Sequence, residues 1–292
     1  MSRPLTLLVN PAAAGGRALE AVAPARAELE RLGAELHVIE TSSADHSKHE
    51  ARNAAEAGKT AVAVGGDGLV GTLAGALAGT DGALAIVPAG RGNDFARVLG
   101  IPHDPAAAAR VAFEGEERLV DVGQVDGKSF VGAASFGLDS DANRIANEAK
   151  IVKGNLVYLY AALRALVAWK PARFDVRIDG EPYTNVGYSV VVANSKAYGG
   201  GMYVAPHAEL DDGRLDVILS DHEPKLRHLR LFPKVFKGTH VTDPSLHFLR
   251  GERVEVNADR PFTVYADGDP LAELPATITV AREALRVMVP RS

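Results

Sequence analysis

The 292-residue sequence contains no cysteine. This absence excludes disulfide bonds, zinc sites built from thiolates and cysteine nucleophiles, and it fits a reducing cytoplasm. Long hydrophobic runs are also missing. The most apolar stretch, Leu156–Trp169, spans 14 residues and is interrupted by Arg164, whereas a membrane-spanning helix needs about 20. The N-terminal run Leu5–Val9 is too short for a signal peptide, so we expect a soluble, cytoplasmic protein.

An excess of positive charge is absent as well, since the formal net charge is -5. A general nucleic-acid binder needs a basic surface to contact phosphates, so we expect no nucleic-acid partner. The sequence also lacks a G-x-x-x-x-G-K-[ST] loop, an H-E-x-x-H zinc motif and a G-x-S-x-G nucleophile motif. Its 47% content of hydrophobic residues leaves ample material for a core.

The first part of the chain alternates between short apolar runs and Ala-rich segments with helical spacing. This alternation is typical of βαβ units around a parallel sheet. It predicts a doubly wound α/β domain over residues 1–124, in which ligands bind outside the carboxyl ends of the strands. The predicted strands are 5–9, 36–39, 61–64 and 84–87, and the predicted helices are 16–32, 45–57 and 70–77.

The second part of the chain has a different pattern, in which apolar residues recur at every second position. Turn signals such as Asp179-Gly180 and Asp267-Gly268 separate these segments. The pattern predicts an antiparallel β-sandwich over residues 125–292, with one helical insert at 152–169. We expect the last residues, about 281–292, to pack back onto the first domain. The predicted strands are 174–179, 187–193, 215–219, 253–256, 262–266 and 276–280.

Three glycine-containing loops follow three of the predicted parallel strands. They are Asn10–Arg17, Gly65–Gly71 and Pro88–Phe95, and the last two carry Asp67 and Asp94. Glycine lets backbone N–H groups approach a polyanion closely, and helix N-termini add partial positive charge. One such loop is explained equally well as a tight turn. Three at one sheet edge, two of them with carboxylates, predict a site for a nucleotide triphosphate.

The second loop also matches the dinucleotide pattern G-x-G-x-x-G between Gly66 and Gly71. In a NAD-binding domain an acidic residue should follow near the end of the next strand, about 20 residues on. Here that strand ends at Pro88, and no acid occurs before Asp94. The sequence therefore favours a kinase over a NAD-dependent oxidoreductase.

These motifs together resemble the diacylglycerol kinase and sphingosine kinase superfamily, in particular the bacterial soluble lipid kinases. The residues that carry the resemblance are Val9-Asn-Pro11, Gly65-Gly-Asp-Gly68 and Pro88-Ala-Gly-Arg-Gly-Asn-Asp-Phe95. The Gly-Gly-Asp-Gly element alone is shared with NAD kinases and phosphofructokinases. The resemblance implies a nucleotide-binding α/β domain, a β-sandwich domain for the lipid, an active site in the cleft between them, and ATP and Mg²⁺ as cofactors.

The resemblance also implies which residues contact the nucleotide and the metal. The positions matching nucleotide contacts are Asn10, Thr41, Gly65, Gly66, Asp67, Gly68, Leu69, Val70, Gly71, Arg91 and Asn93. The carboxylates matching those that organise Mg²⁺ and its waters are Asp67, Asp94 and Asp121. The alternative for Asp67 and Asp94 is that they cap the helices that follow them, and the two roles are compatible.

Two further elements of the β-sandwich domain match the family. Asp267-Gly-Asp269 resembles an Asp-Gly-Glu element that contains the general base, so Asp267 is the leading catalytic candidate and Asp269 the second. The segment 205–216 resembles a loop that holds a structural Mg²⁺, through the Asp212 carboxylate and the carbonyls of Glu209 and Arg214. The alternative for that segment is a plain Asp-Gly hairpin turn.

Two positions depart from the family pattern, because Leu69 and Arg91 stand where the family usually has threonine. Both lost hydroxyls would be available to a nucleotide, although Arg91 offers phosphate a planar charged fork instead. All the candidate catalytic acids remain, so we expect an active enzyme. The two departures keep open the alternative of a non-catalytic nucleotide or lipid sensor.

The expected partners are ATP and a lipid alcohol, most directly diacylglycerol, reached by peripheral contact with the membrane. The segment Lys225–His240 interleaves basic and apolar residues, a pattern of helices that lie among lipid headgroups. The alternative is that the segment packs against the β domain with its charges in solvent. A soluble hydroxyl acceptor, as in NAD kinases, stays an alternative to a lipid. The sequence leaves the oligomeric state open, a homodimer included.

Overall fold

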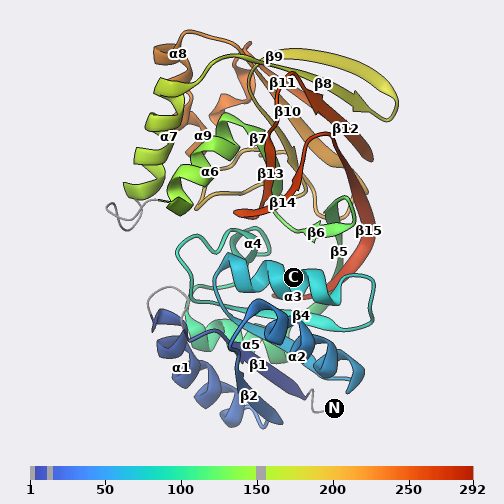
Figure 1. Ribbon diagram of the computed structural model, residues 1–292. Helices are drawn as coiled ribbons and strands as arrows, with labels where there is room; N and C mark the ends of the chain where they lie inside the picture. Colours follow the sequence, from blue (N-terminus) through green and yellow to red (C-terminus); the bar gives the residue numbers. More distant parts are fainter. Residues whose placement is uncertain (1–3, 12–15, 149–155, 292) are drawn as a thin grey trace.

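The structure is a computed structural model that describes residues 4–11, 16–148 and 156–291. It consists of an α/β domain and a β-sandwich domain, stacked one above the other in Figure 1. Both fold types were predicted from the sequence. The residues 12–15 of the first glycine loop and 152–155 of the predicted insert lie outside the described residues.

The α/β domain contains a parallel sheet with the strand order β2–β1–β3–β4. Its central strands are fully buried, whereas the edge strand β2 is half-exposed, as expected for a sheet covered on both faces. Helix α1 packs on α5, and α2 packs on α3. The elements are β1 (Leu5–Val9), α1 (Arg17–Arg31), β2 (Leu36–Glu40), α2 (Ala44–Glu56), β3 (Thr60–Gly65), α3 (Asp67–Leu77), β4 (Ala83–Pro88), α4 (Asp94–Val98) and α5 (Pro105–Glu114).

The order of these strands reverses between β1 and β3. Strand β1 is followed by its neighbour β2 on one side, and β3 lies on its other side. In open α/β sheets the helices diverge at such a switch point and leave a crevice at the carboxyl ends of the strands. Asn10 follows β1 and Gly66 follows β3, so both border this crevice.

The β-sandwich domain is antiparallel and is built around the long strand β9, which pairs with β7, β8 and β10. Strand β8 alternates strictly between buried and exposed residues, which is the period-2 pattern of a half-buried strand. The elements are β5 (Glu116–Val125), β6 (Lys128–Phe130), β7 (Ala133–Gly137), α6 (Leu138–Glu148), α7 (Leu156–Ala168), β8 (Ala172–Ile178), β9 (Glu181–Ala193), β10 (Leu215–Asp221), α8 (Lys225–Leu229), α9 (Phe232–Phe236), a 3₁₀ helix (Thr239–Thr242), β11 (Leu246–Gly251), β12 (Arg253–Ala258), β13 (Thr263–Ala266), β14 (Asp269–Glu273) and β15 (Ala276–Val289).

The described part of the predicted insert at 152–169 forms α7, and a second helix, α6, precedes it. Helix α6 begins directly after β7, and Ser140 donates a hydrogen bond from its hydroxyl to the Gly137 carbonyl. The sequence analysis missed α6, although its few apolar residues recur at helical spacing. Its apolar residues Ala142 and Ile145 pack against the core of the sandwich.

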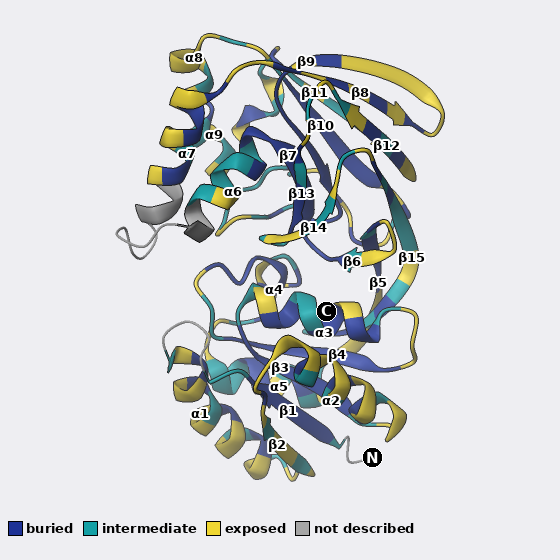
Figure 2. Ribbon diagram, in the orientation of Figure 1, coloured by how far each residue is buried: buried dark blue, intermediate teal, exposed yellow. Residues whose placement is uncertain are grey.

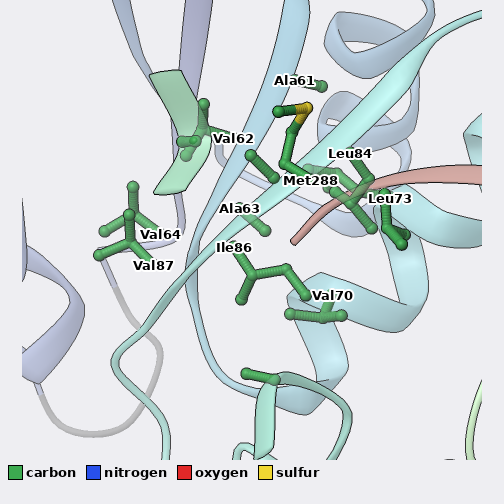
Figure 3. Close-up of a cluster of buried hydrophobic side chains, with 14 of the residues drawn as sticks. Ala61, Val62, Ala63, Val64, Val70, Leu73, Leu84, Ile86, Val87 and Met288 are labelled. Atoms are coloured by element: carbon green, nitrogen blue, oxygen red, sulfur yellow. The ribbon is translucent and has the colours of Figure 1, made fainter. Parts of the chain in front are cut away.

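The strands β5 and β15 belong to both domains. They pair with each other along most of their length, while β15 also pairs with β12 of the sandwich at its start and with β4 of the parallel sheet at its end. Met288, near the end of β15, lies among Ala61, Leu73 and Leu84 in the core of the α/β domain (Figure 3). The end of the chain therefore returns to the first domain and completes its sheet.

The ladder between β5 and β15 is interrupted at a bulge between Ala281 and Leu285. The Asp121 carboxylate, only 1% exposed, accepts hydrogen bonds there from the backbone N–H of Glu283 at 2.7 Å and of Gly213 at 2.6 Å. Gly213 is a buried residue, so its N–H would otherwise lack a partner, which costs free energy. Asp121 thus fixes the junction of the two domains.

We expect Asp121→Asn to destabilise the protein by about 1–3 kcal/mol, the typical cost of a buried hydrogen-bonding group left unsatisfied. The amide side chain keeps one acceptor oxygen and turns an NH₂ group toward the other backbone N–H. Urea unfolding measures the loss. The matched control is Asp126→Asn, because Asp126 is exposed and accepts a single bond from the Thr277 N–H. Equal losses in the two variants would contradict this account of Asp121.

Candidate active site

The second and third glycine loops touch through their backbones. A Cβ atom built on Gly66 would lie 2.8 Å from the Gly90 Cα, and one built on Gly90 would lie 2.4 Å from the Gly66 Cα. Both distances are shorter than real Cβ contacts. Neither position tolerates a side chain, so the ends of β3 and β4 form one continuous surface of main chain. Of the loop after β1, the structure describes the flanking residues Pro11 and Gly16.

Asp67, the first residue of α3, joins these two loops. Its carboxylate accepts hydrogen bonds from the backbone N–H of Asn93 at 2.8 Å and of Asp94 at 2.7 Å. The helix that Asp67 caps is therefore α4, which begins at Asp94, and not its own helix α3. Asn93 adopts a left-handed conformation with φ 53°, and its side chain binds both the N–H and the carbonyl of Gly90.

Asp94 is 7% exposed, and its carboxylate contacts the second domain. It accepts hydrogen bonds from the backbone N–H of Gly200 and of Gly201, each at 2.7 Å. Burial raises the pKa of Asp94; the Gly200 N–H opposes this shift and the nearby Asp67 charge adds to it. A Cβ on Gly92 would lie 2.8 Å from Asp67 Oδ2 and 3.3 Å from Asp94 Oδ2, so the two carboxylates flank one backbone position.

Asp267 faces these acids from the β-sandwich domain. It lies in the tight turn between β13 and β14 with φ 52°, and its carboxylate accepts hydrogen bonds from the N–H groups of Val131, Gly132 and Ala133. A Cβ on Gly71 of α3 would lie 3.6 Å from its Oδ2. Burial raises the pKa of Asp267 to about 6, and the Asp67 charge also raises it. Asp269, the other catalytic candidate, is exposed at the start of β14.

The predicted acids thus fall into two groups. Asp67, Asp94 and Asp267 come together where the two domains meet. The Asp121 carboxylate instead accepts its two hydrogen bonds at the junction of β5 and β15. Asn194 connects Asp121 to the other acids: its side chain donates to the carbonyls of Asp121 and Val131, and the Val131 N–H binds Asp267.

The loop that resembles a structural Mg²⁺ site is occupied by an ion pair. The Asp212 carboxylate contacts the Arg250 guanidinium and also accepts a hydrogen bond from the Arg214 N–H at 3.0 Å. Arg250 lies 3.5 Å from Asp216 as well, while the Glu209 side chain is exposed. In the described part of the chain, no three His, Asp or Glu side chains come together in a way that could hold a metal ion. Asp212 thus has a cationic partner in Arg250, and the metal role of Asp212 and of the Glu209 and Arg214 carbonyls stays a prediction.

The remaining residues with a predicted nucleotide role differ in how open they are. Asn10 is half-buried and Arg91 is exposed. Thr41 is 2% exposed, and its hydroxyl donates to the Val9 carbonyl at 3.2 Å and accepts from Ser47 at 2.9 Å. Leu69 and Val70 are buried in the core of the α/β domain. Because Thr41, Leu69 and Val70 are buried, they support the loops from the protein interior.

A small pocket of about 320 Å³ adjoins the third glycine loop. It lies between the start of α1, this loop and the start of α5. Sequence reasoning missed this pocket and the Gly200–Gly201 contact, since both combine residues from distant segments. The lining residues are Arg17, Glu20, Ala21, Pro88, Ala89, Gly90, Asn93, His103 and Pro105.

We expect Gly90→Ala to destabilise the ligand-free protein by about 1–3 kcal/mol, because the new methyl group would meet backbone that has no room to move. Urea unfolding is again the measurement. Gly68→Ala is the matched control in the neighbouring loop: its Cβ would meet nothing within 4 Å, and alanine is favoured over glycine inside a helix. If Gly90→Ala is as stable as Gly68→Ala, the two loops are not in contact.

Comparisons with known proteins agree with this architecture. A family model described as the diacylglycerol kinase catalytic domain matches residues 4–125, and one described as the YegS C-terminal NAD kinase beta sandwich-like domain matches residues 132–289. A crystal structure of a diacylglycerol kinase from Bacillus anthracis str. Sterne superimposes with a TM-score of 0.74 at 22% identity, covering 98% of this chain and 97% of that one. This likeness shows the shared fold.

Two relatives are similar to this chain in sequence over most of its length. A diacylglycerol kinase from Mycobacterium tuberculosis is 36% identical over 295 residues, which cover 98% of this chain and 95% of the relative. One from Bacillus subtilis is 28% identical over 269 residues, which cover 90% of this chain and 89% of the relative. The family resemblance predicted from the motifs is confirmed. The chain therefore belongs to the diacylglycerol kinase family and is a phosphotransferase that acts on a hydroxyl group.

Proposed function

We propose that the protein is an ATP- and Mg²⁺-dependent lipid kinase that transfers the γ-phosphate to a lipid hydroxyl, most directly that of diacylglycerol, to give phosphatidic acid. The observation that carries this proposal is the meeting of Asp67 and Asp94 from one domain with Asp267 from the other beside exposed loop backbone. Phosphoryl transfer needs positioning, neutralisation of triphosphate charge and a group that accepts the acceptor's proton. The relatives' name, diacylglycerol kinase, supports the choice of lipid.

The backbone of the two touching glycine loops suits the phosphates of ATP. Gly66 and Gly68 present main chain without side chains at the carboxyl edge of the parallel sheet, at the start of α3, and Gly90, whose N–H donates to Asn93, lies against Gly66. Backbone N–H groups in this setting bind anions. Asn10 borders the same crevice, and Arg91 is exposed on the loop, where its guanidinium is available to a phosphate.

Asp67 and Asp94 are the residues that would hold Mg²⁺, directly or through water. Their oxygens flank Gly92, and the charge of Asp67 raises the pKa of Asp94, so a cation between them would relieve repulsion. Oxygen ligands with few carboxylates and several waters suit Mg²⁺. When bound, the ion would neutralise the phosphate charge that grows during transfer. Asp121 accepts the N–H groups of Gly213 and Glu283, away from this pair.

Asp267 is the proposed general base. As the lipid hydroxyl attacks the γ-phosphorus of ATP, its O–H bond breaks and the proton passes to the Asp267 carboxylate. A new O–P bond forms, and the bond from phosphorus to the leaving oxygen of ADP breaks. A base works best when its pKa lies near the operating pH, and the pKa of about 6 for Asp267 meets that condition.

The departure at Leu69 leaves catalysis intact in this proposal. The Leu69 side chain points into the core and approaches Gly65: a Cβ built there would lie 3.0 Å from its Cδ2. The Leu69 side chain is 8% exposed. Leucine in place of the family's usual threonine therefore adds apolar contact beneath the loop. The chemistry above the loop depends on the acids and the main chain, which are retained.

We expect Asp267→Asn to lower kcat by about 10²–10⁴-fold, the usual contribution of a general base. The assay is transfer of labelled γ-phosphate from ATP to diacylglycerol in mixed micelles. Asp269→Asn is the matched control, because Asp269 is exposed two residues away, and it should keep most of the activity. If Asp269→Asn is instead the inactive variant, the base is Asp269.

The pH profile of the same assay gives a second signature of Asp267. A base with a raised pKa is protonated, and hence inactive, below that pKa, so kcat/KM of the wild type should fall as the pH drops through about 6. The residual activity of Asp267→Asn should lack this limb. Transfer without any lipid would point to a soluble acceptor. ATP binding with no turnover on any acceptor would point to a sensor.

Exposed apolar side chains gather on three helices of the β-sandwich domain, which we call the α7–α9 face. Six of the eleven large hydrophobic residues exposed in the described part of the chain lie there. The most exposed are Val167 at 75% and Leu226 at 77%. Lys225 links the helices, since its ammonium group donates to the Val167 carbonyl at 2.6 Å. The six are Tyr160, Leu163, Val167, Leu226, Leu229 and Phe236.

Basic residues surround these apolar side chains. Arg164 lies on α7, where it donates to the Tyr160 hydroxyl, and Arg230 and Lys237 are exposed beside α8 and α9. Figure 2 shows that the outer surfaces of α7 and α8 are exposed on the same flank of the domain. Apolar side chains with a basic surround match an anionic bilayer surface. None of the helices in the described residues is long and apolar enough to span a membrane. We propose that the α7–α9 face rests on an anionic membrane.

We expect Leu226→Glu to reduce binding to phosphatidylglycerol-containing vesicles by about tenfold or more, because the variant loses buried apolar area and adds a repelled charge. Vesicle co-sedimentation measures the binding. The control is Val38→Glu, which alters an exposed apolar residue on β2 of the other domain. Wild-type binding to neutral phosphatidylcholine vesicles should be weak. Equal binding by the two variants would exclude this face as the membrane contact.

A further inference from the structure

A tip of three glycines projects from the β-sandwich domain toward the α/β domain. Tyr198 and Met202 form an isolated antiparallel bridge, with N–H to carbonyl distances of 2.9 and 3.2 Å. Between them, Gly199, Gly200 and Gly201 have φ values of 68°, 87° and 99°. Three consecutive residues in the left-handed region are accessible without strain only to glycine. We call residues 198–202 the glycine tip.

The glycine tip binds one side chain of the other domain through its main chain. Gly200 and Gly201 each direct an N–H group at one oxygen of the Asp94 carboxylate, both at 2.7 Å. Hydrogen bonds to an ionised group at this distance are among the stronger ones in proteins. The Asp94 N–H in turn donates to Asp67 at 2.7 Å. The tip therefore fixes the orientation of the Asp94 carboxylate, while the Asp94 main chain helps to hold Asp67.

The base of the glycine tip is anchored on α6. The Asn143 side chain donates a hydrogen bond to the Tyr198 hydroxyl at 3.0 Å. Burial raises the pKa of Tyr198 to about 12, so the hydroxyl keeps its proton. The fully buried Ser135 hydroxyl lies near it without a well-formed hydrogen bond. A continuous series of contacts thus runs from α6 through Tyr198 and the tip to Asp94.

We propose that Tyr198 is a positioning residue of the kinase: it holds the glycine tip so that two backbone N–H groups fix the Asp94 carboxylate toward Mg²⁺. This role rests on the proposed function, because it concerns the same site. It deepens that function by making the metal-binding half of the site depend on a residue of the acceptor domain. A domain motion that displaced the tip would release Asp94.

A double-mutant cycle in the ligand-free protein tests the contact without any activity assay. The variants are Tyr198→Phe, Asp94→Asn and the two combined, compared by their urea unfolding midpoints. If Tyr198 acts through the tip on Asp94, the loss in the double variant is smaller than the sum of the single losses. Tyr188→Phe is the matched control, since its hydroxyl donates to the Glu223 carbonyl. Its effect should add to that of Asp94→Asn.

Gly201→Ala provides an independent perturbation of the tip if Tyr198→Phe fails to fold. A Cβ at Gly201 would meet nothing within 4 Å, so the substitution acts only through backbone strain. Gly180→Ala is the matched control: Gly180 has φ 91°, has the same open surroundings and lies in the turn between β8 and β9. Both single variants should unfold at a lower urea concentration than the wild type. When each is combined with Asp94→Asn, only the Gly201→Ala double variant should lose less stability than the sum of the two single losses.

Titration calorimetry with ADP, in MgCl₂ and separately in EDTA, distinguishes positioning from a general structural role. We expect Tyr198→Phe to weaken ADP binding by about tenfold in MgCl₂, the scale of lost outer contacts at a metal site, and to leave binding in EDTA within about twofold. The proposal would be overturned if the stability losses in the double-mutant cycles simply add, or if Tyr198→Phe weakens ADP binding equally in MgCl₂ and in EDTA. If the wild type binds no ADP in either buffer, the proposed function fails, and the cycle alone still decides whether Tyr198 positions Asp94.

Discussion

The candidate active site depends on hydrogen bonds from backbone N–H groups to carboxylates. Asp67 binds the loop after β4, Asp94 binds the glycine tip, and Asp267 binds the residues between β6 and β7. A buried charge is costly unless it is hydrogen-bonded, and these N–H groups offset that cost while leaving lone pairs on the oxygens. They also fix each carboxylate in one orientation, which a flexible side-chain partner would do less well.

The ladder between β5 and β15 sets where these acids meet. Both strands run through the two domains, so the α/β sheet and the sandwich share main-chain hydrogen bonds along one side of the molecule (Figure 1). The bulge in β15 bends this ladder, and Asp121 satisfies the Glu283 N–H exposed there. The opposite side of the junction is joined by side-chain contacts such as Asp94 with the glycine tip.

Much of the fold could be predicted from the sequence, because the patterns that indicate strands and turns involve residues that are close together in the chain. Fully apolar strands such as Thr60–Gly65 and the Asp267-Gly268 turn follow from nearest neighbours, and the glycines of two loops follow from their position after parallel strands. The partners of the acids could not be predicted. Asp67 caps α4, 27 residues later, and Asp94 contacts Gly200, 106 residues later. Arg250, which pairs with Asp212, lies 38 positions after it.

Like charges at this junction explain why the glycine tip matters. Asp67 and Asp94 belong to one domain and Asp267 to the other, and the Asp67 charge raises the pKa of both Asp94 and Asp267. Neighbouring carboxylates repel one another, and part of this repulsion acts between the two domains. The Gly200 and Gly201 N–H groups counter this by binding Asp94 across the junction. Main-chain dipoles supply this attraction without a cationic side chain, so the two domains are held together at the acids by backbone N–H groups.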